Sequence, residues 1–281
     1  MKQLNGKVAV ITGGASGIGR ALALALADEG CVVAICDIDR QGLERTAELM
    51  AQKSVDCSIH TVDVADRDLV HEFAANVLDE HGHVDILINN AGVVIADTLE
   101  DVSYADFDWL MGINFWGVVY ITKAFLPSLK RRPEAHIVNI SSVAGVLASP
   151  NNGPYCAAKF AVTGLTETLS QELQGTNVRV SCVFPGGVKT NIQRNARFFK
   201  VANPNLCHED AIECYAKISR LCPDAAARII IKGIRRNKTR ILVGMDARFI
   251  DMMKRVMPVW TTRLAAHFMR KLDISKTKWF T

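Results

Sequence analysis

Short apolar segments alternate with amphipathic segments along most of the chain. The apolar segments predict seven strands, at residues 8–12, 32–37, 58–63, 86–89, 136–141, 179–185 and 240–243. Several of these are continuous runs of valine and isoleucine rather than alternating patterns, which is typical of strands covered on both faces. The amphipathic segments between them predict helices at about residues 17–29, 41–53, 66–81, 104–131, 155–174 and 224–236.

This alternation predicts an α/β fold, in which right-handed crossovers build a doubly wound parallel sheet of about seven strands with helices on both faces. In such a sheet the ligand binds beyond the carboxyl ends of the strands, where the strand order reverses. The motifs described below all fall at a strand end or on the helix that follows. Their joint placement indicates a binding site more strongly than any one of them.

One long segment, residues 191–223, separates the sixth predicted strand from the next predicted helix. Loops of this length in a compact domain are commonly lids over a site. Four of its apolar residues are candidates for lining an apolar pocket, or alternatively for packing the lid down: Phe198, Phe199, Val201 and Leu206.

The end of the chain forms a second distinctive region. We predict one domain over residues 1–245 and a basic amphipathic helical extension, packed on that domain, over residues 246–281, divided into two helices at Pro258. Its apolar residues recur at steps of three or four, namely Phe249, Met253, Val256, Trp260, Leu264, Phe268 and Leu272. Such a stripe packs on its own domain, roofs a substrate site, forms an oligomer interface or contacts an anionic membrane surface. Nucleic-acid binding is not expected, because the stretch matches no recognised module and the rest of the chain is acidic.

The charge distribution separates the same two regions. The chain has 281 residues, of which 49% are hydrophobic and 22% charged, a composition that argues against disorder. Residues 1–227 contain 19 Lys and Arg and 26 Asp and Glu, a net charge of −7. Residues 228–281 contain 14 Lys and Arg and 3 Asp and Glu, a net charge of +11, so that the two sum to +4.

The cysteines and the first residues of the chain indicate the cellular compartment that we expect. Eight cysteines without a CxxC pair are expected to be reduced, mostly buried side chains. Cys207, His208, Cys214 and Cys222 match no familiar zinc spacing, and we predict no metal site. The first residues lack a signal-peptide layout, and no apolar run approaches the roughly 18 residues of a spanning helix. We therefore expect a cytoplasmic protein.

A glycine-rich turn follows the first predicted strand. Gly13, Gly17 and Gly19 lie where that strand ends and the first helix begins. Glycine allows a tight turn and close approach of a pyrophosphate, and a helix N-terminus presents free N–H groups to that anion. The turn therefore predicts a dinucleotide site, although structural glycines alone are common.

Asp37, at the end of the second strand, bears on the choice of dinucleotide. Its carboxylate lies 18 residues beyond Gly19, where it can accept hydrogen bonds from ribose hydroxyls and repel a 2′-phosphate. No Arg or Lys occurs in residues 14–16 or directly after Asp37. This pattern favours NAD over NADP, with Arg40 the main reason to keep NADP as the alternative. A helix N-cap role for Asp37 or Asp39 is a second interpretation.

The third and fourth strands end in further candidate contacts. Asp63 and Val64 end the third strand, and Asn89-Asn90-Ala91-Gly92 ends the fourth. Small and amide side chains there allow an adenine ring and a ribose to lie against the strand ends. Turn formation is the alternative interpretation for these residues.

Tyr155 and Lys159 are the candidate acid–base pair. They lie four residues apart, so on a helix they share one face. A free tyrosine has a pKa of about 10, and a fixed positive charge nearby lowers it. We therefore expect Tyr155 to exchange a proton with an alcohol or carbonyl oxygen near neutral pH.

Taken together, these motifs resemble those of the classical short-chain dehydrogenase/reductase family, over about residues 5–245. The resemblance rests on Thr12-Gly13-x-x-x-Gly17-Ile18-Gly19, Asp63-Val64, Asn89-Asn90-Ala91-Gly92, Asn114, Ser142, Tyr155-x-x-x-Lys159 and Pro185-Gly186. It implies a single-domain Rossmann fold that forms dimers or tetramers. The catalytic residues it implies are Asn114, Ser142, Tyr155 and Lys159. The cofactor-binding residues it implies, together with the strand-end motifs, are Gly13, Ser16, Gly17, Ile18, Gly19, Asp37, Asp63, Val64, Asn90, Ala91, Gly92, Tyr155, Lys159, Pro185, Gly186, Val188 and Thr190.

The resemblance also implies a role for each catalytic residue. Ser142, chosen over Ser141 by its thirteen-residue spacing from Tyr155, hydrogen-bonds the substrate oxygen. Lys159 holds the nicotinamide ribose and stabilises the phenolate, and Asn114 anchors a water that relays protons.

The expected function is hydride transfer between NAD(H) and a secondary alcohol or ketone, which we expect to be lipophilic. Three alternatives stay open at this point: an NADP-dependent carbonyl reductase, a peripheral membrane enzyme acting on lipid-derived alcohols, and a dinucleotide-sensing module without turnover. The intact catalytic set argues against the last, because a sensor has no need of a proton relay. We expect a small-molecule substrate and a homodimer or homotetramer.

Overall fold

Seven parallel strands form the central sheet of the structure, a computed structural model that describes residues 1–53, 55–198 and 208–271. Their order is β3-β2-β1-β4-β6-β7-β9, so the order reverses between β1 and β4. The strands are β1 (Val8–Thr12), β2 (Val32–Asp37), β3 (Cys57–Thr61), β4 (Ile86–Asn89), β6 (Ala135–Ile140), β7 (Val178–Pro185) and β9 (Arg240–Val243). All seven predicted strands are present, the third beginning one residue and ending two residues earlier than predicted. The α/β prediction of a doubly wound sheet is confirmed.

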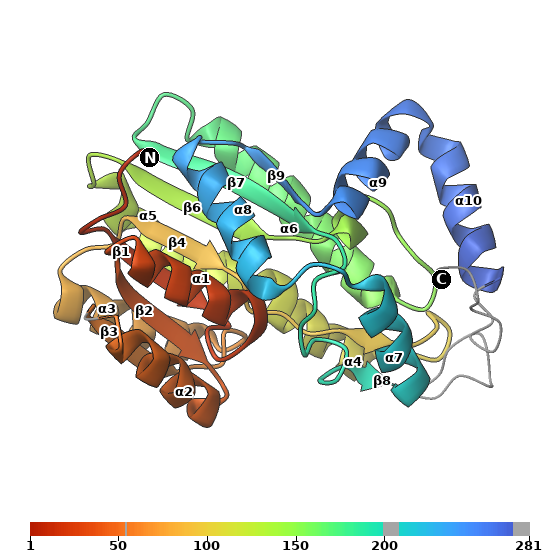
Figure 1. The fold of residues 1–281 in the computed structure, drawn as a ribbon, viewed down its shortest axis with the longest axis horizontal. Helices are drawn as coiled ribbons and strands as arrows, with labels where there is room; N and C mark the ends of the chain where they lie inside the picture. Colours follow the sequence, from red (N-terminus) through yellow and green to blue (C-terminus); the bar gives the residue numbers. More distant parts are fainter. Residues whose placement is uncertain (54, 199–207, 272–281) are drawn as a thin grey trace.

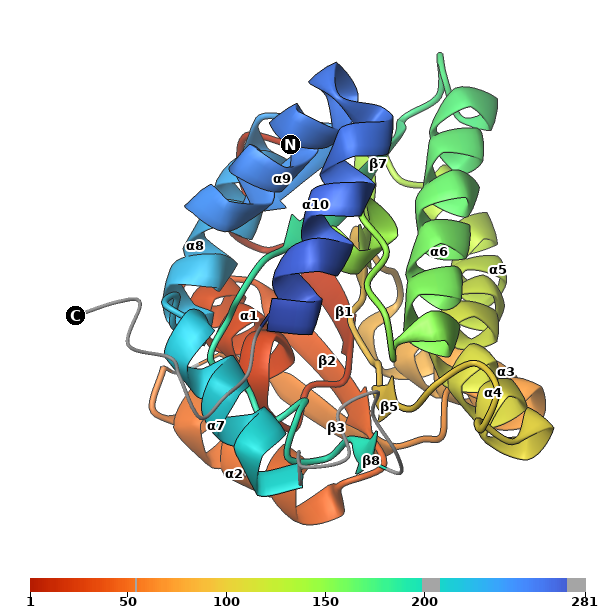
Figure 2. The ribbon, with the colours of Figure 1, turned by 90° about the vertical axis from the view of Figure 1, so that its right-hand side faces the viewer.

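Helices cover both faces of this sheet (Figures 1 and 2). They are α1 (Gly17–Asp28), α2 (Arg40–Ala51), α3 (Arg67–His81), α4 (Tyr104–Met111), α5 (Gly117–Lys130), α6 (Gly153–Glu172) and α8 (Pro223–Arg235). One apolar core lies between the sheet and α1, α2 and α8, and includes Leu22, Leu43 and Ile230. A second core lies on the opposite face under α3, α5 and α6, where the rings of Phe73 and Phe125 meet edge to face at 5.7 Å.

A π-helix (Gly112–Trp116) joins α4 to α5, so the predicted helix at 104–131 is interrupted. By length and composition the stretch Tyr104–Lys130 also satisfies the criteria for a membrane-spanning helix, contrary to the expectation from the sequence. In this fold Ile121, Phe125 and Leu129 are buried in the core between α5, α3 and the sheet. Core packing thus accounts for part of the apolar character of the stretch, since 39% of its most apolar window is buried in the fold.

The segment predicted to be a lid contains regular structure. A short strand, β8 (Arg197–Phe198), pairs with β5 (Ile95–Ala96), and α7 (His208–Ile218) follows. Phe198 lies in β8, whereas Phe199, Val201 and Leu206 lie outside the described residues.

The last described part of the chain is a helical hairpin that projects beyond the sheet (Figure 1). Its helices are α9 (Met245–Val256) and α10 (Pro258–Lys271), divided at Pro258 as predicted. The base of α9 packs on β9 and on the 3-10 turn Val143–Gly145 that follows β6.

Candidate active site

A cavity of about 1060 Å³ lies at the carboxyl ends of the strands, at the point where the strand order reverses. This volume reaches the upper end of the roughly 300–1,000 Å³ usual for ligand pockets. The predicted site residues that line it are Gly13, Ser16, Gly17, Ile18, Asp37, Asp63, Val64, Asn90, Ala91, Gly92, Ser142, Tyr155, Lys159, Pro185, Gly186, Val188 and Thr190. Of the predicted residues, Gly19 and Asn114 lie behind this lining.

The glycine-rich turn fits an anionic group at one end of the cavity. Gly13 and Gly17 have φ angles of +70° and +54°, which residues with a side chain rarely adopt. No acidic residue and no side-chain cap occupies the first turn of α1, so its N-terminus is suited to a phosphate. A Cβ on Gly19 would collide with the Gly13 carbonyl oxygen, so Gly19 serves the close packing of turn and helix.

Asp37 is tied to this turn by its carboxylate. It accepts hydrogen bonds from the backbone N–H groups of Ala15 and Asp39, both at 3.1 Å. The capping role belongs to Asp39, whose side chain accepts from Gly42 at the start of α2. Asp37 is therefore positioned at the cavity wall and does not cap the helix.

The two arginines nearest to this end are engaged with protein groups. Arg40 pairs with Glu44 at 2.8 Å. Arg20 donates to the Thr46 hydroxyl at 2.9 Å and to the carbonyl oxygens of Ala15 and Gly42. Arg20 is thus held by three protein groups, whereas Arg40 makes one exposed ion pair.

A hydrogen-bonded link joins the ends of β1 and β4 across the switch point. The Thr12 hydroxyl accepts from the backbone N–H groups of Asn90 and Ala91, both at 3.0 Å. The Asn90 amide donates to the carbonyl oxygens of Thr12 and Gly13, at 3.0 and 3.1 Å. Thr12 and the Asn90 side chain thus hold the glycine-rich turn in place, a role that the sequence pattern did not reveal.

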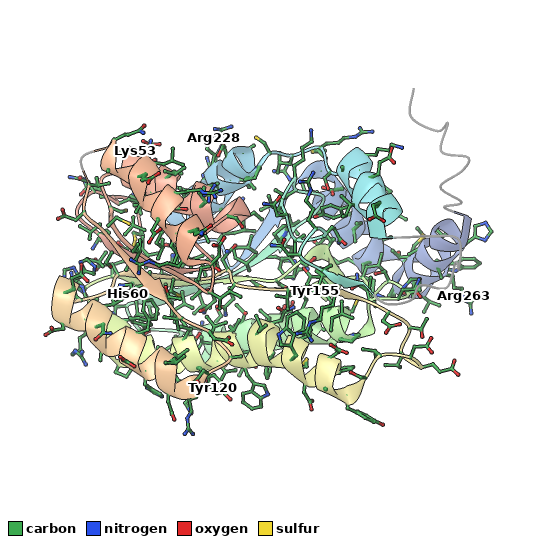
Figure 3. The ribbon with its side chains drawn as sticks, turned by 90° about the horizontal axis from the view of Figure 1, so that it is seen from below. Lys53, His60, Tyr120, Tyr155, Arg228 and Arg263 are labelled. Carbon is green, nitrogen blue, oxygen red and sulfur yellow. The ribbon has the colours of Figure 1, made fainter. Side chains whose placement is uncertain are left out.

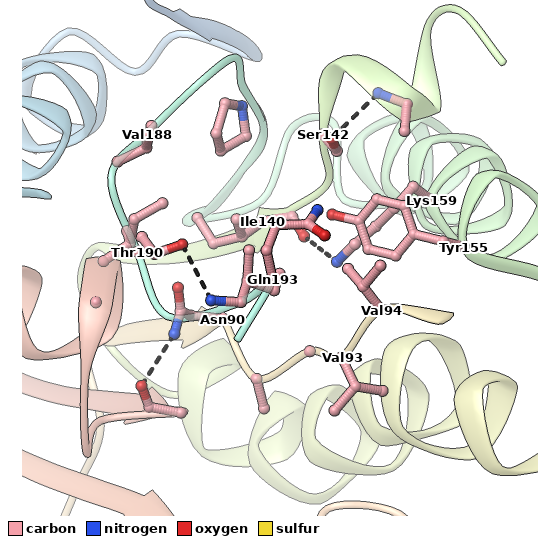
Figure 4. Close-up of a pocket in the computed structure, with 18 of the residues that line it drawn as sticks. Asn90, Val93, Val94, Ile140, Ser142, Tyr155, Lys159, Val188, Thr190 and Gln193 are labelled. Atoms are coloured by element: carbon pink, nitrogen blue, oxygen red, sulfur yellow. Dashed lines mark hydrogen bonds between the residues drawn. The ribbon is translucent and has the colours of Figure 1, made fainter. Parts of the chain in front are cut away.

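Tyr155, Lys159 and Ser142 meet at the other end of the cavity (Figure 4). The Lys159 ammonium nitrogen lies 5.6 Å from the centre of the Tyr155 ring and donates to the Ile140 carbonyl oxygen at 3.0 Å. The Ser141 hydroxyl instead donates to the backbone carbonyl of Lys159 at 2.9 Å. Ser141 is therefore held by α6, which leaves Ser142 as the hydroxyl beside Tyr155.

Burial governs the pKa values of this pair. Loss of hydration raises the pKa of Tyr155 above its usual value, and the neighbouring Ser142 hydroxyl opposes that rise only in part. Loss of hydration also lowers the pKa of Lys159 from 10.5 to about 8. The expected net fall of the Tyr155 pKa is thus wrong for this structure, because desolvation of the phenolate is the largest effect.

Asn114 lies in the π-helix, fully buried. Its side chain donates to the Val93 carbonyl oxygen and accepts from the Val93 N–H, both at 2.8 Å. A Cβ built on Gly92 would lie 3.3 Å from the Asn114 amide oxygen and 3.5 Å from the Lys159 nitrogen. Asn114 is therefore close to Lys159, and its contacts hold the chain beyond β4 against the cavity. A π-helix is frequent at such sites.

The wall beyond Tyr155 is mainly apolar and comes from segments distant in sequence. It includes Val94, Trp109, Leu147, Ile192, Ile250 and Ala265. No short motif carries these residues, so the sequence did not reveal them. The helix α4 is linked to β8, because the Arg197 guanidinium stacks on the Trp109 ring at 3.6 Å and pairs with Asp106 at 2.6 Å.

The turn after β7 is fixed from two sides. Asp246, at the start of α9, accepts from the Gly187 N–H at 2.6 Å. The Tyr215 hydroxyl of α7 donates to the Val188 carbonyl oxygen at 3.3 Å. The predicted contacts Val188 and Thr190 are thereby held at the cavity wall, between the glycine-rich turn and Tyr155 (Figure 4).

Comparison with known proteins places the chain among dehydrogenases. The sequence model of a family described as short chain dehydrogenase matches residues 7–199. The chain is 39% identical to the putative oxidoreductase SadH of Mycobacterium tuberculosis over 268 residues, 95% of this chain and 96% of SadH.

Two crystal structures are similar over most of the fold. One is a short chain dehydrogenase/reductase from Burkholderia phymatum in complex with NAD, with 31% identity and a TM-score of 0.83 over 91% of this chain and 95% of that one. The other is an alcohol dehydrogenase from Thermococcus sibiricus complexed with 5-hydroxy-NADP, with 30% identity and a TM-score of 0.71 over 85% of this chain and 94% of that one.

Proposed function

The chain belongs to the short-chain dehydrogenase/reductase family of NAD(P)-dependent oxidoreductases, and we propose that it transfers a hydride between NAD(H) and a lipophilic secondary alcohol or ketone. One observation carries this proposal. A single cavity is bounded at one end by the glycine-rich turn and Asp37, and at the other by Ser142, Tyr155 and an apolar wall.

Each end of the cavity has a part in the proposal. The N-terminus of α1 would hold the pyrophosphate, and Asp37 the adenosine ribose. The bound dinucleotide would supply the site that accepts or donates hydride. The Burkholderia relative binds NAD and the Thermococcus relative binds an NADP derivative, so membership of the family leaves both cofactors open. Asp37, together with the engagement of Arg20 and Arg40 by protein groups, supports NAD.

The proton chemistry is assigned to the residues of α6. In reduction, Tyr155 donates its proton to the carbonyl oxygen, while Ser142 donates a hydrogen bond to the same oxygen as negative charge develops on it. Because burial raises the pKa of Tyr155, the phenol is protonated at neutral pH and ready for this role. In oxidation Tyr155 must start as the phenolate in order to accept the alcohol proton, so we expect this direction to become faster as the pH rises.

The apolar wall supports a lipophilic substrate. Val94, Trp109, Leu147 and Ile192 offer no charged partner to a substrate next to Tyr155. Burying a substrate's apolar surface there contributes about 25 cal/mol per Å². A cytoplasmic location and a homodimeric or homotetrameric assembly, expected from the sequence, stay predictions.

A substrate panel tests the proposal. Purified protein is mixed with secondary alcohols or ketones of increasing chain length and with NAD(H) or NADP(H), and the reduced nicotinamide is followed by absorbance. We expect turnover with NAD(H), a kcat/KM with NADP(H) that is at least about tenfold lower, and a kcat/KM with NAD(H) that rises with substrate length. Dinucleotide binding without turnover on any substrate would favour the sensing module instead.

A further inference from the structure

The α9 helix has its apolar side facing solvent. Met245, Phe249, Met252 and Val256 recur at steps of four, three and four residues, so they lie on one narrow face of the helix. Their exposed fractions are 75%, 59%, 54% and 72%. A helix that packs on its own domain normally directs such a stripe inward. Here the stripe has no partner among the described residues.

The orientation of α9 is fixed by a charged residue on its inner side. Asp251 is buried and pairs with the Arg240 guanidinium at 2.5 Å, which itself lies 4.0 Å from the centre of the Phe184 ring. Asp251 also pairs with Arg255 of its own helix at 3.0 Å, so rotating α9 to bury its apolar stripe would break the pair with Arg240 and move Asp251 out of its buried place. The outward direction of the stripe is therefore built into the packing of α9.

The second helix of the hairpin, α10, also exposes apolar side chains. Val259 and Trp260 are exposed just beyond Pro258, and Leu264 follows one turn later. Polar contacts hold the two helices together, since the Thr261 hydroxyl donates to the Met253 and Met257 carbonyl oxygens at 2.9 and 2.7 Å. We call the exposed apolar residues of this hairpin the α9–α10 surface: Met245, Phe249, Met252, Val256, Val259, Trp260 and Leu264.

Basic side chains border this surface. Arg248 and Arg255 are exposed on α9, and Arg263 is exposed on α10 at the outer edge of the molecule, 5.7 Å from the centre of the Trp260 ring (Figure 3). They belong to the segment 228–281, whose net charge is +11, whereas residues 1–227 carry −7. The chemistry that matches an exposed apolar stripe edged by arginines is an apolar layer covered by anions, as in an anionic lipid bilayer.

We propose that the α9–α10 surface binds an anionic lipid bilayer, with its apolar side chains in the interfacial region and its arginines among the headgroups. A second copy of the chain is the competing occupant. A two-fold contact through this surface would bring the basic border of one copy, with Arg248 and Arg263, close to the basic border of the other, and such like-charge contacts are unfavourable. Lipid phosphates instead neutralise these charges, so the observations favour the bilayer.

Bilayer binding would also place the cavity next to the lipid. Ile250 of α9 and Ala265 of α10 line the cavity, and so does Ile218 of α7, which is more than half exposed. A lipophilic alcohol or ketone dissolved in the bilayer would then reach Tyr155 along an apolar wall. This consequence rests on the proposed function, whereas the binding itself does not.

Vesicle co-sedimentation of the full chain tests the binding. The vesicles contain phosphatidylcholine alone or phosphatidylcholine with phosphatidylglycerol, at low and at high salt. We expect binding to the phosphatidylglycerol vesicles, weakened by salt, and at least about tenfold weaker binding to phosphatidylcholine alone, since each basic residue near an anionic surface adds to the affinity. Equal binding to both kinds of vesicle, or to neither, would overturn the proposal.

Matched variants locate the binding surface. The double variant Phe249→Ala with Trp260→Ala should bind the anionic vesicles at least about tenfold more weakly, because both side chains are exposed and lose only their burial in lipid. The control, Leu49→Ala with Leu69→Ala, changes exposed residues on α2 and α3 and should bind as the unchanged protein does. Arg248→Glu should also weaken binding at least about tenfold, while Arg45→Glu on α2 should not.

Sedimentation equilibrium of the same variants separates the two occupants. The unchanged protein could form an oligomer that the Phe249 and Trp260 double variant does not form, while neither of the two binds vesicles. In that case the surface is an interface between copies and the proposal fails. These readouts do not depend on catalysis, so a failure of the substrate panel leaves the lipid result standing, and the reverse also holds.

Discussion

The ammonium nitrogen of Lys159 lies 5.6 Å from the centre of the Tyr155 ring, and its hydrogen bond is made to the Ile140 carbonyl oxygen at 3.0 Å. Lys159 is thus buried next to Tyr155, and the group that accepts its hydrogen bond is an uncharged carbonyl. A lysine in this setting loses much of its hydration, which is why its pKa falls to about 8. The pH dependence of stability follows from this relationship.

Lys159 should make the unbound protein more stable as the pH rises from about 8 to 10.5. In that window the unfolded chain holds the lysine proton and the folded chain does not, so raising the pH favours folding. Relative to Lys159→Met, the free energy of unfolding of the unchanged protein should rise by roughly 3 kcal/mol across the window and stay level below pH 8. Denaturant titrations of both proteins at several pH values measure the difference. A difference that does not change with pH would show that Lys159 keeps its proton in the folded state.

Asp37→Ser should reduce the preference for NAD over NADP. The substitution removes the negative charge that would face a 2′-phosphate, an interaction of about 1 to 4 kcal/mol at contact distance. We expect the ratio of kcat/KM with NAD to that with NADP to fall at least about tenfold. Asp39→Ser is the control, because serine also caps a helix and the charge it removes belongs to the α2 cap. An equal change in both variants would contradict the assignment to Asp37.

Arg197→Ala should raise KM for apolar substrates more than it lowers kcat. Arg197 holds the segment of β8 to α4 by pairing with Asp106 and by stacking on the Trp109 ring, a cation–π contact of about 1–2 kcal/mol. Loss of these contacts should raise KM about five- to thirtyfold, because part of the binding free energy of the substrate would then be used to order the apolar wall. Arg194→Ala, an exposed arginine of the same segment, should leave KM unchanged. Steady-state kinetics that show the same KM for both variants would exclude this positioning role.

The strands of the sheet and the glycine-rich turn at one end of the cavity were predictable, because short stretches of sequence specify them. Continuous apolar segments with β-branched residues predicted each strand to within about two residues, and glycines between a strand and a helix marked the turn. Tyr155 and Lys159 share a helix face by their spacing alone. These features follow from short stretches of chain and from the geometry of regular structure.

Other features depend on contacts between distant segments. Asn114, in the π-helix, pairs with Val93 beyond β4, and the rise in the Tyr155 pKa follows from burial. Periodicity predicted an apolar stripe on α9, but the stripe was expected to pack on the domain. Its outward direction is decided by the buried pair of Asp251 with Arg240, which no local pattern reveals.

The central claim is that Tyr155 exchanges the proton at the reacting oxygen. The most direct measurement compares Tyr155→Phe with Tyr215→Phe, which removes another hydroxyl at the cavity wall. For each variant, dinucleotide affinity is measured by titration and kcat on the best substrate of the panel. We predict that Tyr155→Phe folds and binds dinucleotide with unchanged affinity but loses kcat by at least about a thousandfold, whereas Tyr215→Phe loses less than about tenfold. A Tyr155→Phe protein that keeps kcat within about tenfold of the unchanged protein would contradict the claim.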